Sequence, residues 1–280
     1  MLLKEQFYVY LTQIGYAKST QTAQKYHLNS FLNYIKKTIE SITTKDIIKY
    51  QNYLKTKENK QTGNQLSESS IYGNMNTIKL FFNWLETNQL ISENPISSLK
   101  FKKPKTATRT PLTKEEIKEL FDAANSLQEI AMLHLFYSCG LRRAEASSLN
   151  ISDIHFTNQI LYVRSGKGKK RRVVPITDKV SKALENYIIS ERPQTTETEA
   201  FIINRRGKRM DGYSYNTAFK KLKERTSIIR DASPHYLRHS IATHLLTNGL
   251  SIENIRQFLG HSDLATTQIY AKVNLRNFEF

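Results

Sequence analysis

Residues 99–111 interrupt the regular patterning of this 280-residue chain and divide it into two parts of different character. The segment from Lys100 to Pro111 is polar, basic and interrupted by prolines, which is typical of a linker between domains. A chain of this length accommodates two domains with separate cores. We therefore predict one domain at residues 1–99, a basic linker at 100–111 and a second domain at 112–280.

The first part carries apolar residues at helical spacing, which predicts a bundle of four or five helices. Thr43 or Thr44 can cap one further helix that runs to Leu54. The polar residues 55–70 are predicted to form a loop. Because the aromatic residues of this part fall at helical spacing, we assign them to the core rather than to base stacking. The stripes are Phe7, Tyr10, Leu11 and Ile14; Leu28, Phe31, Leu32 and Ile35; and Ile78, Phe81, Phe82 and Leu85.

The second part mixes helices with a few short strands. Residues 160–164 and 171–175 read as two strands joined by a basic turn that contains glycine, and residues 200–203 as a third strand. The predicted fold class is mainly α, with a small antiparallel β-sheet in the second domain.

The helices of the second part show clear start and stop signals. Thr113 with Glu116 resembles a capping box, and a second helix is expected at 127–138. Ser233 is a good N-cap, with proline in the first helical position, and Gly249 is a good stop signal. Within that last helix, the buried stripe is expected to consist of Leu237, Ile241 and Leu245.

The charge of the chain points to a polyanionic partner. It has 42 basic and 25 acidic side chains, a formal charge of +17. Residues 1–105 hold 15 basic and 7 acidic side chains, and the remainder holds 27 and 18. Both parts can therefore bind a phosphate backbone, as in a clamp around nucleic acid. A solvated lysine-rich surface without such a partner would show the same charge.

The sequence favours the cytoplasm. A single cysteine, Cys139, excludes an intrachain disulfide framework and agrees with a reducing compartment. The first residues lack the apolar run of a signal peptide, and no stretch approaches the roughly 20 apolar residues that span a bilayer. We expect no membrane partner.

One cluster of motifs carries chemistry. His235 and Arg238 lie three residues apart on a predicted helix, followed by His261 and then Tyr270. Arginine offers planar donors for phosphate oxygens, histidines move protons, and a tyrosine can become a covalent nucleophile. This chemistry requires neither a metal nor another cofactor.

At this point the residues resemble the tyrosine recombinase family, and specifically its compact Xer-like members. Five segments match in order and spacing. They are Cys139–Glu145, Gly166–Gly168, Pro234–His239, Leu259–Ser262 and Thr267–Tyr270.

The resemblance implies a helical core-binding domain followed by a catalytic domain, and a role for each motif residue. Arg142 and Arg238 would bind the phosphate, and Lys167 on the turn would be the general acid. The remaining implied roles are His235 as general base, His261 as second histidine, Tyr270 as nucleophile and Glu145 as supporting acidic residue.

The implied function is site-specific recombination of double-stranded DNA through a 3′-phosphotyrosyl intermediate, in chromosome dimer resolution or in integration, excision or inversion of a mobile element. A homotetramer, or a heterotetramer with a related recombinase, would act on two DNA sites. The basic residues expected to contact DNA are Lys102, Lys103, Lys105, Lys169, Lys170, Arg171 and Arg172.

Three other functions compete with recombination. A type IB topoisomerase shares the nucleophile, but the separate helical domain and the short chain favour recombination. A non-catalytic DNA-binding regulator would not need Arg142, Lys167 and Tyr270 together. A metal nuclease would want several carboxylates beside the histidines, and the two C-terminal motifs contain only Asp263.

Overall fold

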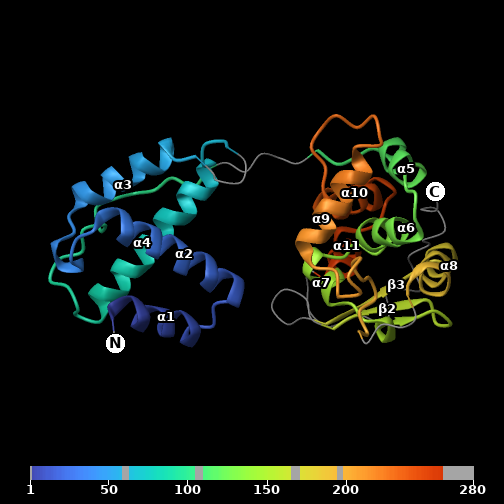
Figure 1. The fold of residues 1–280 in the computed structure, drawn as a ribbon, viewed down its shortest axis with the longest axis horizontal. Helices are drawn as coiled ribbons and strands as arrows, with labels where there is room; N and C mark the ends of the chain where they lie inside the picture. Colours follow the sequence, from blue (N-terminus) through green and yellow to red (C-terminus); the bar gives the residue numbers. More distant parts are fainter. Residues whose placement is uncertain (1, 59–62, 105–109, 165–170, 194–197, 261–280) are drawn as a thin grey trace. The chain divides into compact units, whose positions relative to one another are not determined.

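The computed structural model describes residues 2–58, 63–104, 110–164, 171–193 and 198–260. The chain divides into two compact units, Met1–Ala107 and Thr108–Phe280, each with its own hydrophobic core. Figure 1 shows the helices and strands of each unit. Each unit is described by itself below.

Four α-helices and one short 3₁₀ turn make up the described part of the first unit, which confirms the predicted bundle. They are α1 Leu3–Gln13, α2 Lys18–Ile35, η1 Ile39–Ser41, α3 Thr44–Thr56 and α4 Glu68–Thr87. The N-cap of α3 is Thr43, whose hydroxyl and backbone form a reciprocal capping box with Asp46.

The core of the first unit is built from aromatic side chains. Phe7 packs edge-on against Phe81 with ring centroids 5.1 Å apart, and Phe31 packs the same way against Tyr50 at the same distance. Such edge-to-face pairs add stability beyond the area that they bury. The assignment of these aromatic residues to the core is confirmed, since all four are fully buried.

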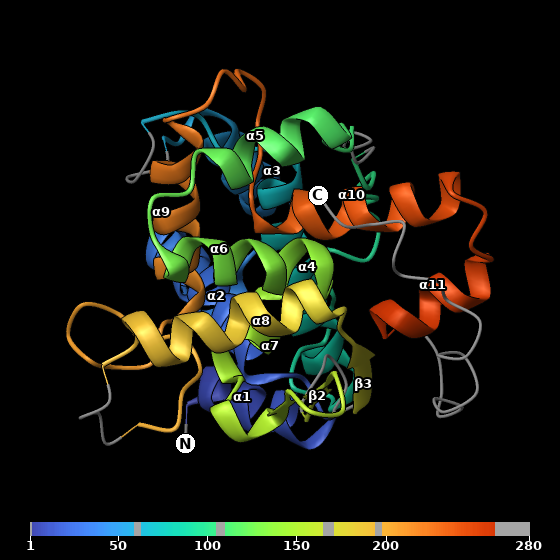
Figure 2. The same cartoon turned by 90° about the vertical axis from the view of Figure 1, so that its right-hand side faces the viewer.

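The second unit consists of helices and a small sheet that lies at one edge of the unit (Figure 2). Its helices are α5 Lys114–Asp122, α6 Leu127–Leu133, α7 Arg143–Ser148, α8 Asp178–Asn186, α9 Gly212–Lys223, α10 Pro234–Thr247 and α11 Ile252–Leu259. A π-helical turn, η2 His134–Ser138, continues α6, and another, η4 Tyr187–Glu191, continues α8; η3 Ile151–Asp153 is a 3₁₀ turn. The capping box of Thr113 and Glu116 is present at the start of α5.

The sheet is antiparallel, with the order β1 Ile154–His155, β2 Ile160–Val163 and β3 Arg172–Pro175. Leu161 pairs with Val174, and both side chains are fully buried beneath the helices. The two strands expected at 160–164 and 171–175 are confirmed.

The prediction of a third strand at residues 200–203 was wrong. Residues 200–203 are buried as expected, but they meet their neighbours only through single bridges, Asn150 with Ala200 and Ile203 with Arg209. Their apolar character reflects burial in the core, and within the described part of the chain no neighbouring segment runs beside them long enough to form a ladder. The third strand is β1, which has only two residues and no readable alternation.

Helix α10 begins as predicted, with Ser233 at the N-cap position and Pro234 in the first turn, although the Ser233 side chain makes no capping hydrogen bond. Leu237, Ile241 and Leu245 are buried, which confirms the predicted stripe. Ser240 on the same helix accepts a hydrogen bond of 2.8 Å from the backbone N–H of Leu112.

The two ends of the basic stretch each belong to one unit. Phe101 packs against the first core, while the guanidinium of Arg230 donates to the carbonyls of Thr110 and Pro111 in the second unit. Among the described residues, no helix combines the length and the apolar character needed to cross a membrane.

Candidate active site

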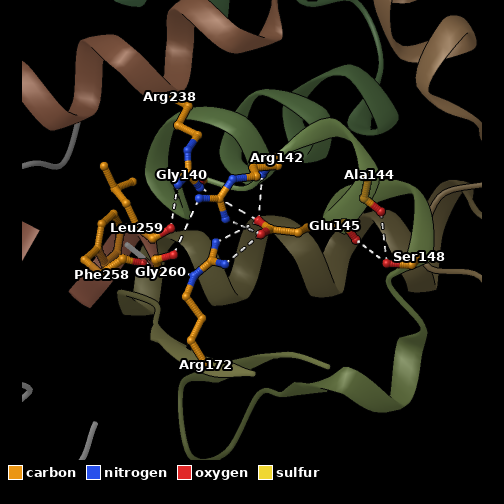
Figure 3. Close-up of polar contacts among 10 residues, drawn as sticks. All are labelled: Gly140, Arg142, Ala144, Glu145, Ser148, Arg172, Arg238, Phe258, Leu259 and Gly260. Carbon is orange, nitrogen blue, oxygen red and sulfur yellow. Dashed lines mark hydrogen bonds and ion pairs between the residues drawn. The ribbon is translucent and has the colours of Figure 1, made fainter. Parts of the chain in front are cut away.

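Glu145 lies at the centre of a cluster of arginines in the second unit (Figure 3). It occupies the third position of α7, where its carboxylate accepts a 2.8 Å hydrogen bond from the backbone N–H of Arg142, the N-cap residue. The Glu145 side chain is 1% exposed. A buried carboxylate is stable only with charged partners, and here three guanidinium groups supply them.

Arg172 and Arg142 both donate hydrogen bonds to this carboxylate. Arg172, from the start of β3, donates from Nη1 to Oε1 at 2.9 Å and from Nη2 to Oε2 at 2.8 Å, a parallel two-bond arrangement. Arg142 adds a bond of 2.7 Å from Nη1 to Oε1. The carboxylate of Glu145 therefore accepts four hydrogen bonds, three from guanidinium groups and one from the backbone.

Arg238 enters the cluster from α10. Its Nη1 lies 3.8 Å from Oε2 of Glu145, within ion-pair distance, and donates to the carbonyl of Gly140. Its Nη2 donates to the carbonyl of Leu259 at 2.5 Å. The Arg238 side chain is 8% exposed. The Arg142 side chain, at 19%, is the most exposed of the three arginine side chains.

The C-terminal end of α11 is held by all three arginines. Arg172 Nε donates to the carbonyl of Phe258 at 3.1 Å, and Arg142 Nη2 to that of Gly260 at 3.5 Å. Together with the bond from Arg238 to Leu259, three successive carbonyls each accept from a different guanidinium. Cations are favourable at this end of a helix because the unpaired carbonyls carry partial negative charge.

The charges of the cluster shift the pKa values of its members. Burial by itself raises the pKa of Glu145, but the hydrogen bonds and charge of Arg172, with those of Arg142, outweigh it and lower the pKa to about 2. Burial, reinforced by the positive charges of Arg142 and Arg172, lowers the pKa of Arg238 to about 9. Three positive charges share one carboxylate, so the cluster carries two positive charges in excess.

The structure brings together three of the predicted site residues, Arg142, Glu145 and Arg238. His235 lies in the first turn of α10, on an exposed part of that helix. The remaining predicted site residues, Lys167, His261 and Tyr270, and the predicted DNA contacts Lys105, Lys169 and Lys170, lie outside the described residues.

The other predicted DNA contacts divide into two groups. Lys102, Lys103 and Arg171 are exposed, as a contact with DNA requires. For Arg172 the structure corrects the prediction of a DNA contact. Its side chain is 4% exposed, and its guanidinium is bound to Glu145 and to the carbonyl of Phe258. Sequence reasoning missed its place in the cluster, although the two-residue period of β3 puts Arg172 on the same face as the buried Val174.

Comparisons with known proteins agree with this architecture. Residues 110–276 match the Phage integrase family, and residues 3–92 match its N-terminal SAM-like domain. The chain belongs to the phage integrase family.

The curated relatives are named as tyrosine recombinases. A tyrosine recombinase of Thermosipho africanus is 35% identical over 96% of this chain and 94% of that protein. XerD of Oceanobacillus iheyensis is 32% identical over 96% and 93%. This chain is accordingly a tyrosine site-specific recombinase, and the competing functions are set aside.

Solved structures share the fold. The crystal structure of XerA recombinase has 29% identity and a TM-score of 0.53, covering 99% of this chain and 96% of that one. A lambda integrase dimer bound to a core site has a TM-score of 0.72 at 17% identity, covering 93% and 94%. At that level of identity, the second comparison concerns the fold alone.

Proposed function

We propose that the arginine cluster binds the phosphodiester at which this recombinase cuts and rejoins DNA. The observation that carries the proposal is the pair of excess positive charges on three largely buried guanidinium groups around Glu145. Burial makes such an excess costly, and an anion would offset it. Arg142 and Arg238 are the two that we assign to the non-bridging oxygens, because planar guanidinium groups match phosphate geometry.

The proposed reaction begins with attack of the Tyr270 hydroxyl oxygen on phosphorus. His235 takes the phenolic proton, since tyrosine has an ordinary pKa near 10 and must lose its proton during attack. The bond to the 5′ oxygen breaks, and Lys167 protonates this leaving group. Attack by a 5′-hydroxyl from the partner strand then reverses the step without an external energy source, with His261 as the second histidine of the site.

Double-stranded DNA is the proposed substrate. The charge of +17 is spread over both parts of the chain, and Lys102, Lys103 and Arg171 are exposed. Solved integrases of the same fold are bound to DNA, among them the lambda and Tn1549 enzymes. We further propose that a tetramer acts on two DNA sites in the cytoplasm, to resolve chromosome dimers or to move or invert an element.

Covalent capture tests the function. The Tyr270→Phe protein is used to retain its site from fragmented genomic DNA, and a nicked duplex containing that site is then offered to the wild type in EDTA. We expect a complex that resists SDS and carries a 3′-phosphotyrosyl bond. Tyr270→Phe should bind the duplex and form none, while the exposed Tyr213→Phe serves as the matched control and should form it. An adduct that persists in Tyr270→Phe eliminates Tyr270 as the nucleophile.

A further inference from the structure

Arg172 differs from the other two arginines of the cluster in how its hydrogen bonds are used. Both terminal nitrogens bind the Glu145 carboxylate, and Nε binds the carbonyl of Phe258. The side chain is 4% exposed, against 19% for Arg142. Arg172 is therefore committed to partners inside the protein, whereas Arg142 is the arginine closest to solvent.

The surroundings of Arg172 hold its guanidinium in place. A Cβ added to Gly260 would lie 2.9 Å from Cδ and 3.0 Å from Nη1 of Arg172, so the backbone of this glycine packs directly against the side chain. Gly260 has a φ of +71°, in the left-handed region that glycine adopts without strain. Arg172 is thus fixed at its stem by Gly260 and at Nε by Phe258.

The partner of Arg172 in turn fixes Arg142. Glu145 binds both the backbone N–H and the Nη1 of Arg142, at 2.8 and 2.7 Å. Two parallel bonds from Arg172 define the plane of the Glu145 carboxylate. The direction of the Arg142 guanidinium depends on that plane, because its Nη1 binds Oε1 while the backbone N–H of the same residue binds Oε2.

We propose that Arg172 is a positioning residue for DNA cleavage, which holds the Glu145 carboxylate so that Arg142 is aimed at the phosphate. The inference rests on the proposed function and assigns Arg172 a role other than contact with DNA. A lysine at this position keeps the charge but loses the parallel pair of bonds. Misplacement of a binding group by about 1 Å slows a reaction about 10²-fold, so Arg172→Lys should slow cleavage by about that factor.

The test compares single-turnover cleavage of the nicked duplex at saturating DNA with the Kd for the same duplex. Arg172→Lys should lose about 10²-fold in rate and less than about threefold in affinity, because Arg172 does not touch DNA. The matched control is Arg192→Lys, which changes another buried arginine of the same unit. Arg192 donates to the carbonyls of Thr198 and Ala200, two residues outside the arginine cluster. The Arg192→Lys substitution should lower the unfolding temperature of the protein and leave its cleavage rate unchanged.

A double-mutant cycle separates positioning from stability. If Arg172 acts through Glu145, Arg172→Lys should add less than about threefold to the loss already caused by Glu145→Gln. Losses that multiply, or an Arg172→Lys protein that cleaves at the wild-type rate, would overturn the inference. Should Arg172→Lys fail to fold, Glu145→Gln combined with Arg172→Gln removes both charges together, which is milder than removal of one. Wild-type cleavage by this double variant would also overturn it.

The wild-type reaction distinguishes the two proposals. A wild-type adduct with an unaffected Arg172→Lys rate removes this inference alone. No adduct from the wild type removes the proposed function and this inference with it.

Discussion

At the scale of single residues, Glu145 should be the most sensitive position of the described site. Glu145→Gln removes the only carboxylate that faces Arg142, Arg172 and Arg238 among the described contacts. Loss of one partner of a buried ion pair costs about 3–5 kcal/mol of unfolding free energy. We expect a loss of that size by urea denaturation at neutral pH, together with slower cleavage.

The matched control is Asp122→Asn. Asp122 pairs with Lys118 one helical turn away, but both side chains are more than 60% exposed. Exposed pairs of this kind contribute less than about 1 kcal/mol. An equal loss of stability in the two variants would contradict a special role for burial at Glu145.

The stabilisation that Glu145 provides should also depend on pH. Its pKa in the folded protein is about 2, below the ordinary 4.5, because the arginines outweigh the effect of burial. A depressed carboxyl pKa stabilises the fold fully above pH 4.5, and this contribution is lost as the pH falls towards 2. The difference in unfolding free energy between the wild type and Glu145→Gln should therefore shrink across that window, and a constant difference would contradict the cause.

Sequence reasoning reached the chemistry of these residues but not their geometry. Arg142, Glu145 and Arg238 were recognised because their spacing matches a known family pattern. Arg172 was read as one more basic residue in the run after Lys167, since charge alone does not tell a surface arginine from a buried one. The signal was the alternation in β3, where Arg172 and Val174 share the inward face.

At the scale of elements, Gly140 sets how closely α11 approaches the turn before α7. Gly140 has a φ of +57°, and a Cβ there would lie 2.7 Å from Leu259 Cδ2 and 3.2 Å from Phe258. Gly140→Ala should therefore combine about 1–2 kcal/mol for the left-handed backbone with about 1–3 kcal/mol for overpacking. Because the Gly140 carbonyl accepts from Arg238, cleavage should slow as well.

Gly249→Ala isolates the backbone cost of this change. Gly249 has a φ of +85° and nothing within 4 Å of the added Cβ. In urea unfolding, Gly249→Ala should lose only the roughly 1–2 kcal/mol that the left-handed backbone costs. Its cleavage rate should be that of the wild type. Equal losses at Gly140 and Gly249 would show that the contact with α11 has no energetic weight.

Elements with long regular patterns were predictable, and those set by tertiary contacts were not. The stripe of α10 and the capping box of α5 follow from local spacing. The apolar run at 200–203 predicts a strand from its composition, but burial in a core and β-structure produce the same composition. Whether such a run joins a ladder depends on how far its neighbours run beside it, and residues 149–151 and 209–210 do so only briefly.

At the scale of the whole molecule, both units are expected to grip DNA. Residues 1–107 and 108–280 have separate cores, so each can be prepared alone. Each should bind duplex DNA weakly, and the intact chain far more tightly, because the tether raises the effective concentration of the second unit to about the millimolar range. The measurement is Kd as a function of salt for all three proteins.

The salt dependence gives the sharper comparison. The intact chain should show the steepest fall of affinity with salt, since it neutralises the most phosphates. If residues 108–280 match the full chain both in affinity and in the dependence of affinity on salt, the first unit does not bind DNA. The prediction that both units bind DNA together would then be wrong.

The end of α11 and an incoming phosphate draw on the same donors. Phe258, Leu259 and Gly260 present three successive carbonyls to Arg172, Arg238 and Arg142, and the proposed scissile phosphate would compete for the last two of these guanidinium groups. A phosphate bound there would share these two guanidinium groups with the carbonyls of the helix end. His261 follows Gly260 directly, and Tyr270 comes nine residues later. We therefore predict that phosphate binding changes the hydrogen bonds at the residue from which the sequence continues to the proposed nucleophile.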